Sequence, residues 1–112
     1  MSVYYPVNFE DFSKWLENGN SNPNLYIIKY STTWCGPCKK CRPAFESLSR
    51  EYPQVFFASV DIDVWEEEGQ IENSSQDIRS FPTFHFINKG KILKVIEGWN
   101  EQLIRQFILT GS

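Results

Sequence analysis

Apolar and polar residues follow two different patterns along the chain, one with helical periodicity and one typical of buried strands. Apolar residues recur every three or four positions over 9–17, and Asn8 before them is a favoured N-cap, so we expect a helix there. Residues 18–24 are turn-forming and end this helix. Residues 25–30 are almost all apolar without alternation, which predicts a central strand covered on both faces.

A longer helix is predicted over 36–52, because one apolar stripe runs through it at helical spacing. The residues of this stripe are Cys38, Cys41, Phe45 and Leu48. Residues 54–62 are rich in Val, Phe and Ile and predict the next strand. The acidic segment 64–78 is predicted to be a partly helical crossover, with Gly69 as a helix breaker.

The last third of the chain predicts a hairpin and a final helix. Strands are expected at 83–87 and 92–96, joined by the turn-forming residues 88–91. Asn100 then caps a helix that ends near Leu109. The side chains of this helix that we expect to face inward are Leu103, Ile104 and Phe107.

With a short edge strand over 3–5, these elements predict an α/β fold, a central mixed sheet of about five strands flanked by about four helices. A length of 112 residues predicts one domain, 1–112. The net charge of −3 gives no reason to expect nucleic acid as a partner, and no apolar run approaches a membrane span. The N-terminus lacks the basic start and apolar run of a signal peptide, so we expect a cytoplasmic protein.

Candidate chemistry enters at residues 34–38, where two cysteines stand three positions apart at the predicted start of the long helix. Gly36 permits a close approach, and Pro37 presets a first-turn φ while removing a donor that the helix leaves unpaired. Cys35 then lies at the positive end of the helix dipole, which favours thiolate over thiol. Cys38, one turn deeper, is the natural resolving partner, so the pattern predicts a redox-active disulfide.

Two metal sites are the alternatives to a redox pair. A zinc site needs a second pair of cysteine or histidine ligands, and only Cys41 and His85 remain, with His85 inside a predicted strand. The run Cys35, Cys38, Cys41 also has the spacing found in iron–sulfur proteins, but the fourth cysteine and its following proline are missing. We therefore expect no metal and no bound cofactor, with the disulfide itself as the redox centre. Cys41 is expected to be a buried packing residue, with a regulatory thiol as the alternative.

Several motifs in the same order resemble the thioredoxin family over roughly residues 9–109. They are the active-site signature 34–39, the helix proline Pro43, the segment 79–83, the hairpin 86–91 and the late glycine Gly98. In this family the signature carries the two redox cysteines, and the segment before the hairpin carries a cis-proline. Spaced motifs in the right order are far more specific than one cysteine pair alone.

The resemblance implies a protein disulfide reductase that is recycled by an NADPH-dependent thioredoxin reductase and acts on disulfide-containing proteins. It implies that the bond before Pro82 is cis and frees the backbone of Phe81 to pair briefly with a substrate chain. The residues implied to contact substrate are Trp34, Gly36, Pro37, Phe81, Pro82, Gly98 and Trp99. The aromatic members form an expected exposed rim around Cys35, and Trp65 is expected to join it.

Lys29 departs from the family pattern, because thioredoxins usually carry a buried aspartate at this position that relays the proton of the second cysteine. Alternation along the strand places Lys29 on the same face as residues 25 and 27. We expect the lysine to extend to the end of the sheet and pair with Asp61 or Asp63, since fully buried unpaired lysines are rare. The alternative is a lysine buried beneath the disulfide. In either place, Lys29, Asp61 and Asp63 are candidates for tuning the redox potential.

Two rival functions remain open at this point. A protein disulfide isomerase or oxidase would use the same fold, but oxidising members usually carry Gly-His between the cysteines, where this chain has Gly-Pro. A binding module could use the fold as a scaffold without redox chemistry. The presence of Cys35, Cys38 and Pro82 argues against that module, while Lys29 keeps it under consideration.

Overall fold

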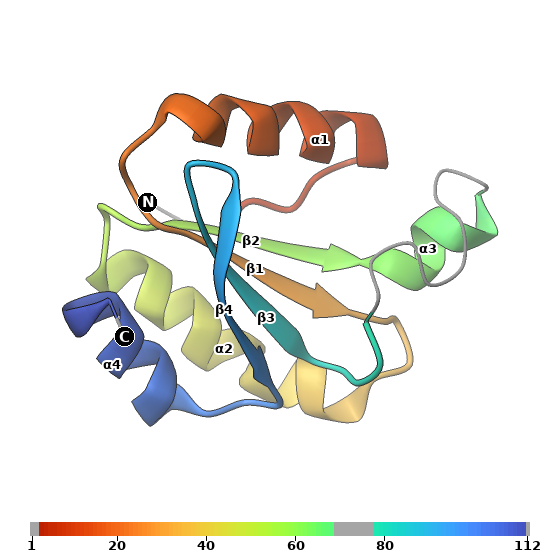
Figure 1. Cartoon of the computed structure of the whole chain (residues 1–112). Coiled ribbons are helices and arrows are strands. Elements are labelled where there is room, and N and C mark those ends of the chain that lie inside the picture. The colour runs from red at the N-terminus through yellow and green to blue at the C-terminus, as the bar shows by residue number, and fades with distance from the viewer. Residues whose placement is uncertain (1–2, 69–77, 112) are drawn as a thin grey trace.

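A mixed four-stranded sheet forms the centre of the computed structural model, which describes residues 3–68 and 78–111 (Figure 1). The strands lie in the order β2-β1-β3-β4. Their bounds are Tyr26–Ser31 (β1), Phe56–Asp61 (β2), Thr83–Asn88 (β3) and Lys91–Glu97 (β4). Strand β1 pairs in parallel with β2 and antiparallel with β3, and β3 pairs antiparallel with β4. The α/β fold with a mixed sheet is as predicted.

Helices cover both faces of this sheet (Figure 1). Helix α1 lies on one face, and α2 and α4 lie on the other, while α3 follows β2 at the end of the sheet. The helix bounds are Phe9–Asn18 (α1), Gly36–Glu51 (α2), Ile62–Glu67 (α3) and Glu101–Thr110 (α4), with a short 3-10 turn at Gly19–Ser21 after α1. Asn8 and Asn100 cap α1 and α4 as predicted, each side chain accepting a backbone N–H three residues ahead.

Two apolar cores fill the spaces between the sheet and its helices. All six residues of β1 are buried, as expected of a central strand. The core on the α2 and α4 side contains Ile27, Cys41, Phe45, Leu48, Val55, Phe57, Phe84, Phe86, Ile96, Ile104 and Phe107, together with Val3. The core on the α1 side contains Phe12, Ile28, Tyr30, Ala58, Val60, Ile62 and Trp65. The predicted α2 stripe is therefore confirmed, and it anchors the helix that carries the cysteines.

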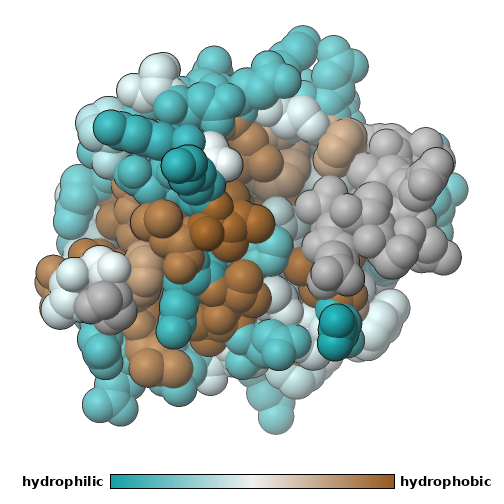
Figure 2. All heavy atoms as spheres, viewed as in Figure 1, coloured by the Kyte–Doolittle hydropathy of each residue, from teal (hydrophilic) through white to brown (hydrophobic). Residues whose placement is uncertain are grey.

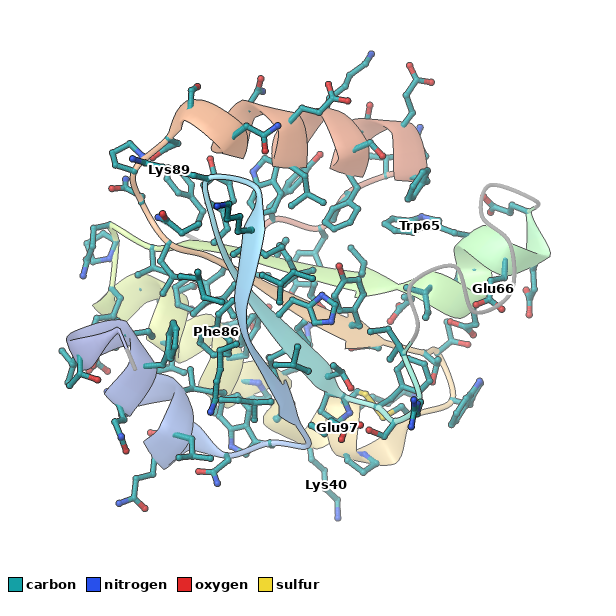
Figure 3. All side chains as sticks on the ribbon, viewed as in Figure 1. Lys40, Trp65, Glu66, Phe86, Lys89 and Glu97 are labelled. Carbon is teal, nitrogen blue, oxygen red and sulfur yellow. A yellow bond between two sulfur atoms is a disulfide. The ribbon has the colours of Figure 1, made fainter. Side chains whose placement is uncertain are left out.

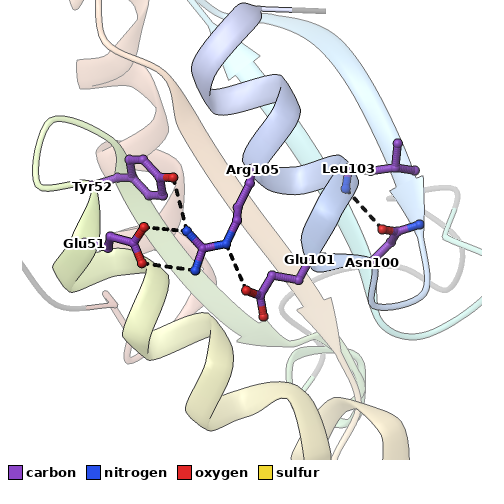
Figure 4. Close-up of polar contacts among 6 residues, drawn as sticks. All are labelled: Glu51, Tyr52, Asn100, Glu101, Leu103 and Arg105. Carbon is purple, nitrogen blue, oxygen red and sulfur yellow. Dashed lines mark hydrogen bonds and ion pairs between the residues drawn. The ribbon is translucent and has the colours of Figure 1, made fainter.

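Helix α4 is attached to the far end of α2 through Arg105 (Figure 4). Its guanidinium binds both carboxylate oxygens of Glu51, one of them at 3.0 Å, and donates to Glu101 at 2.9 Å. It also donates to the Tyr52 hydroxyl at 3.2 Å. These contacts fix α4 against the C-terminal end of α2, opposite the cysteines.

The predicted edge strand over 3–5 is reduced to a single bridge, so the sheet has four strands and not five. Tyr4 donates its N–H to the Phe57 carbonyl at 2.8 Å and accepts from the Ser59 N–H at 3.0 Å. Pro6 has no N–H to continue the pairing, and its ring restricts the residue before it. The chain therefore leaves the edge of β2 after one paired residue.

Two further predictions need correction. Leu103 is 41% exposed, while Ile104 and Phe107 are buried, because α4 contacts the sheet along a narrow stripe that Leu103 misses. The helical part of the acidic crossover begins at Ile62, earlier than predicted. Gly69, the expected breaker, and the rest of 69–77 lie outside the described residues.

The hairpin turn and the outer face of β4 complete the fold. Lys89 and Gly90 both have positive φ, 50° and 78°, which is the conformation of a tight two-residue hairpin turn. Strand β4 exposes Ile92, Leu93 and Val95, which contribute to the apolar surface seen in Figure 2. Across the described ranges, no helix is long and apolar enough to cross a membrane.

Candidate functional site

Cys35 and Cys38 form a disulfide at the start of α2 (Figure 3). Cys35 is the N-cap of this helix, and its sulfur accepts the Cys38 N–H at 3.1 Å. Its carbonyl accepts the Lys39 N–H at 3.3 Å, so the helix begins at the disulfide. Pro37 lies in the first turn, where its missing N–H leaves no helical bond unmade. A thiolate on Cys35 would thus meet a backbone donor and the positive end of a 16-residue helix.

Burial does not distinguish the two cysteines in the disulfide form. Cys35 and Cys38 are each 3% exposed, although Cys38 lies one turn deeper in the helix. What separates them is the N-cap position, because only the Cys35 sulfur accepts a helix N–H. This asymmetry favours charge on Cys35.

A cis peptide bond joins Phe81 to Pro82, as the resemblance implied. The Pro82 carbonyl accepts the Gly98 N–H at 2.7 Å, which ties the segment before β3 to the end of β4. Gly98 has φ 81°, a left-handed conformation that favours glycine. The Thr83 hydroxyl donates to the Ser80 carbonyl at 2.6 Å and closes the same turn. The cis-proline is therefore fixed from both sides.

The predicted aromatic rim is only partly assembled. Trp34 is 71% exposed and packs edge-on against Phe81, with ring centroids 5.8 Å apart, which brings the cis-proline segment beside the cysteine motif. Trp99 is half-buried and leans on Phe84 of the core at 5.7 Å. Trp65, on α3, is 4% exposed and points toward α1, so the prediction that it joins the rim is wrong (Figure 3).

Trp65 is buried because α3 starts at Ile62. Ile62 and Trp65 then fall on one helix face, and that face packs on the α1 side of the sheet. The Trp65 ring contacts Phe9 and Phe12, with centroids 5.7 and 5.5 Å away. The side chain is thus a core residue.

Lys29 lies beneath the disulfide. Its side chain is 3% exposed, and its Nζ donates to the Cys38 carbonyl at 2.8 Å and lies 5.7 Å from the Phe45 ring centroid. The expected extension to the end of the sheet is therefore wrong, because strand alternation directs Lys29 at the underside of α2, where the carbonyl offers a nearer partner. Burial lowers the pKa of Lys29 below its ordinary value.

The two candidate partners of Lys29 have other surroundings. Asp63 accepts the Thr33 N–H at 3.1 Å and the Thr33 hydroxyl at 2.6 Å, which fixes the loop before Trp34. Asp61 is the last residue of β2, and partial burial, with the Asp63 charge beside it, raises the pKa of its carboxyl. Among the described residues, neither aspartate forms an ion pair with Lys29.

Cys41 packs below the same site, as predicted. It is 4% exposed within the α2 core, and its thiol donates to the Cys38 carbonyl at 3.4 Å. Burial raises the pKa of this thiol, so it remains protonated. In the part of the chain that the structure describes, no group of three or more potential metal ligands gathers anywhere.

Sequence analysis missed two polar residues beside the disulfide. The hydroxyls of Ser31 and Thr32 are buried, and within the described residues neither has a hydrogen-bond partner. Strand alternation could have placed Ser31 on the face of Lys29. Nothing in the sequence indicates that Thr32, in the loop after β1, would be buried.

A disulfide at a helix N-terminus, beside a cis-proline on a mixed sheet, defines a protein that exchanges disulfides with others. The thioredoxin family model matches residues 4–110. Thioredoxin of Ictalurus punctatus is 38% identical over 108 residues, covering 95% of each chain, and human thioredoxin is 37% identical over 75% of this chain and 76% of its own. The structure of Fasciola hepatica thioredoxin superposes with a TM-score of 0.81 at 32% identity, covering 98% of this chain and 100% of that one.

The chain belongs to the thioredoxin family. It is a protein disulfide oxidoreductase with a thioredoxin fold, and Cys35 and Cys38 perform its dithiol–disulfide exchange.

Proposed function

We propose that Cys35 is the attacking thiol of a protein disulfide reductase. Its thiolate attacks one sulfur of a substrate disulfide, forming a mixed disulfide and releasing the other substrate sulfur as a thiolate. Cys38 then loses its proton and attacks the Cys35 sulfur, which releases the second substrate thiolate and leaves the Cys35–Cys38 disulfide. Two electrons pass to the substrate. The observation that carries this assignment is the 3.1 Å contact from the Cys38 N–H to the Cys35 sulfur.

Substrate chains bind over the surface that surrounds Cys35. Gly36 and Pro37 are exposed in the first turn of α2, and Trp34 is exposed before it. Within the described residues, the backbone N–H and carbonyl of Phe81 have no hydrogen-bond partner, so an extended peptide can pair with them as a short added strand. Further contacts come from Pro82, Gly98 and Trp99. Family likeness supports disulfide-containing proteins as substrates, an NADPH-dependent thioredoxin reductase as the recycling enzyme and a cytoplasmic location.

Lys29 tunes the redox pair through its charge. A protonated ammonium below Cys38 stabilises thiolates at the disulfide position and so favours the dithiol form. Asp61 opposes this effect to the extent that it is ionised. Asp63 contributes by fixing Thr33, and with it the entry to the cysteine motif.

Reduction of insulin disulfides tests the proposed direction and the roles of the cysteines. The wild type should precipitate the insulin chains in the presence of a chemical reductant, while Cys35→Ser should be inactive. Cys38→Ser should instead accumulate a mixed disulfide with the substrate, because the attacking thiol remains. A Cys35→Ser variant that still forms this adduct would overturn the assignment.

A second assay separates the reductase from its rivals. Recovery of scrambled ribonuclease measures isomerase and oxidase activity, and we expect little of it beside fast insulin reduction. A protein without either activity would be a binding module.

A further inference from the structure

A polar cleft of about 290 Å³ opens beside the disulfide, between the ends of β1 and β2 and the first turns of α2. Strand pairing sets Lys29 opposite Ser59 and Ser31 opposite Asp61. These four side chains therefore share the sheet face that looks toward α2. Cys38, the resolving cysteine, lines the opposite wall.

The lining of this cleft is cationic. Among the described residues, Lys29, Lys39 and Arg42 line it, against the one carboxylate of Asp61. Arg42 is partly neutralised, because its Nε lies 3.4 Å from Glu46. Lys29 is different, since it is buried and its charge faces no ion-pair partner among the described residues. An anion or hydration would stabilise this buried ammonium, which burial otherwise drives to lose its proton.

Unused hydrogen-bond donors point to the same place. Of the three N–H donors of the Lys29 ammonium, one is taken by the Cys38 carbonyl and a second is directed at the Cys41 sulfur, which leaves one for a ligand. Ser31 and Thr32, both lining the cleft, are 3% and 5% exposed and keep hydroxyls without a partner in the described chain. Buried polar atoms in native proteins are rarely left unpaired, so these groups indicate a ligand.

We propose that this cleft binds a small oxyanion, of the phosphate or carboxylate class. The ammonium of Lys29 supplies the charge, the hydroxyls of Ser31 and Thr32 supply neutral donors, and Lys39 closes the site from the helix. Hydrogen bonds between a cation and an oxyanion are stronger than those to water, which favours the anion over a water molecule here.

The anion couples to the redox pair, a consequence that rests on the proposed function. A bound anion and a thiolate compete for the same ammonium, so the anion binds the disulfide form more tightly than the ionised dithiol form. By linkage, it favours the disulfide to the same degree. The ligand would make the protein a stronger reductant where the anion is abundant.

Titration of the disulfide form with inorganic phosphate, followed by amide chemical shifts at constant ionic strength, tests the site. Saturable shifts should centre on Ser31, Thr32 and Cys38. Lys29→Met should weaken binding about tenfold or more, as expected for loss of a buried cation from a charged pair. Acetate in place of phosphate shows which oxyanion the site prefers.

Lys39→Met and Lys40→Met form a matched pair, because both lysines are exposed neighbours on α2 and only Lys39 lines the cleft. Figure 3 shows Lys40 directed away from the body of the protein. Binding should weaken in Lys39→Met and stay near wild type in Lys40→Met, and this comparison remains valid if Lys29→Met fails to fold. Equal effects of the two lysines, or shifts that never saturate, would overturn the proposal. Since the titration uses the resting disulfide protein, it is independent of whether insulin is reduced.

Discussion

Replacing Lys29 by methionine removes a buried charge from beneath the redox pair while keeping a side chain of similar length. We expect the pKa of Cys35 to rise and the reduction potential to fall, because the thiolate of the dithiol form loses a nearby cation. The helix dipole and the Cys38 N–H remain in place, so only the lysine contribution is removed. Lys29→Arg keeps the charge and is the matched control.

The contact between Lys29 and Cys38 sets the size of the effect. Nζ lies 2.8 Å from the Cys38 carbonyl, which holds the ammonium close to the redox pair. Two unit charges about 8 Å apart interact by about 2 kcal/mol at an effective dielectric of about 20. That corresponds to a rise of about 1.5 units in the pKa of Cys35. The potential falls by up to about 40 mV, at pH values where wild-type Cys35 is ionised and Lys29 is still protonated.

Thiolate absorbance across pH gives the pKa of Cys35, and equilibration with glutathione gives the potential. Titration curves of Lys29→Met that overlay those of the wild type would refute the reasoning, and would mean that Lys29 is neutral or screened. A shift that appears equally in Lys29→Arg would show that altered packing, and not charge, is responsible.

Four further outcomes test the buried lysine, the cysteine pair, the exposed Trp34 and the contact between α2 and α4. Burial lowers the pKa of Lys29, so the unfolded chain keeps this proton to higher pH than the folded protein does. The free energy of unfolding in urea should therefore rise as the pH approaches 10.5, and Lys29→Met should lose that rise. Limiting iodoacetamide should label Cys35 before Cys38 in the dithiol form, and the reverse order would contradict the N-cap argument. Trp34→Ala should slow reduction of insulin several-fold but leave reduction of lipoamide nearly unchanged, whereas equal losses would assign Trp34 to the fold. Arg105→Gln should lower the melting temperature without changing the thiol pKa, and an unchanged melting curve would show that its contacts with α2 are screened.

The parts of the fold that the sequence predicts well are those with a strong local pattern. The continuous apolar run of β1 and the apolar stripe of α2 identify both elements. The strand is buried on both faces of the sheet, and the helix is buried along one face. The cysteine motif and cis-proline follow from the family resemblance. Asn8 and Asn100 mark the starts of their helices through capping.

What the sequence could not predict depends on where distant elements meet. Strand alternation predicts which face of the sheet Lys29 lies on. Only the position of α2 over that face shows that the Lys29 ammonium meets the Cys38 carbonyl and not a carboxylate. The burial of Trp65 depends on α3 starting two residues earlier than its acidic pattern indicates. Tyr4 shows a third limit, since one bridge and a full edge strand have the same local sequence.

The short span of the disulfide connects its potential to the stability of the fold. Cys35 and Cys38 are three positions apart, so cross-linking them removes little freedom from the unfolded chain, about 2 kcal/mol in the chain-entropy account. A thermodynamic cycle joins folding to oxidation. In it, the free energy of unfolding of the oxidised protein minus that of the reduced protein is set by the difference between the reduction potentials of the unfolded and folded chains, converted to energy for two electrons. A buried cation that stabilises the reduced folded protein makes this difference in unfolding free energy smaller. Melting curves of the oxidised and reduced proteins therefore report the same effect of the buried charge as the reduction potential does, and they need no redox partner.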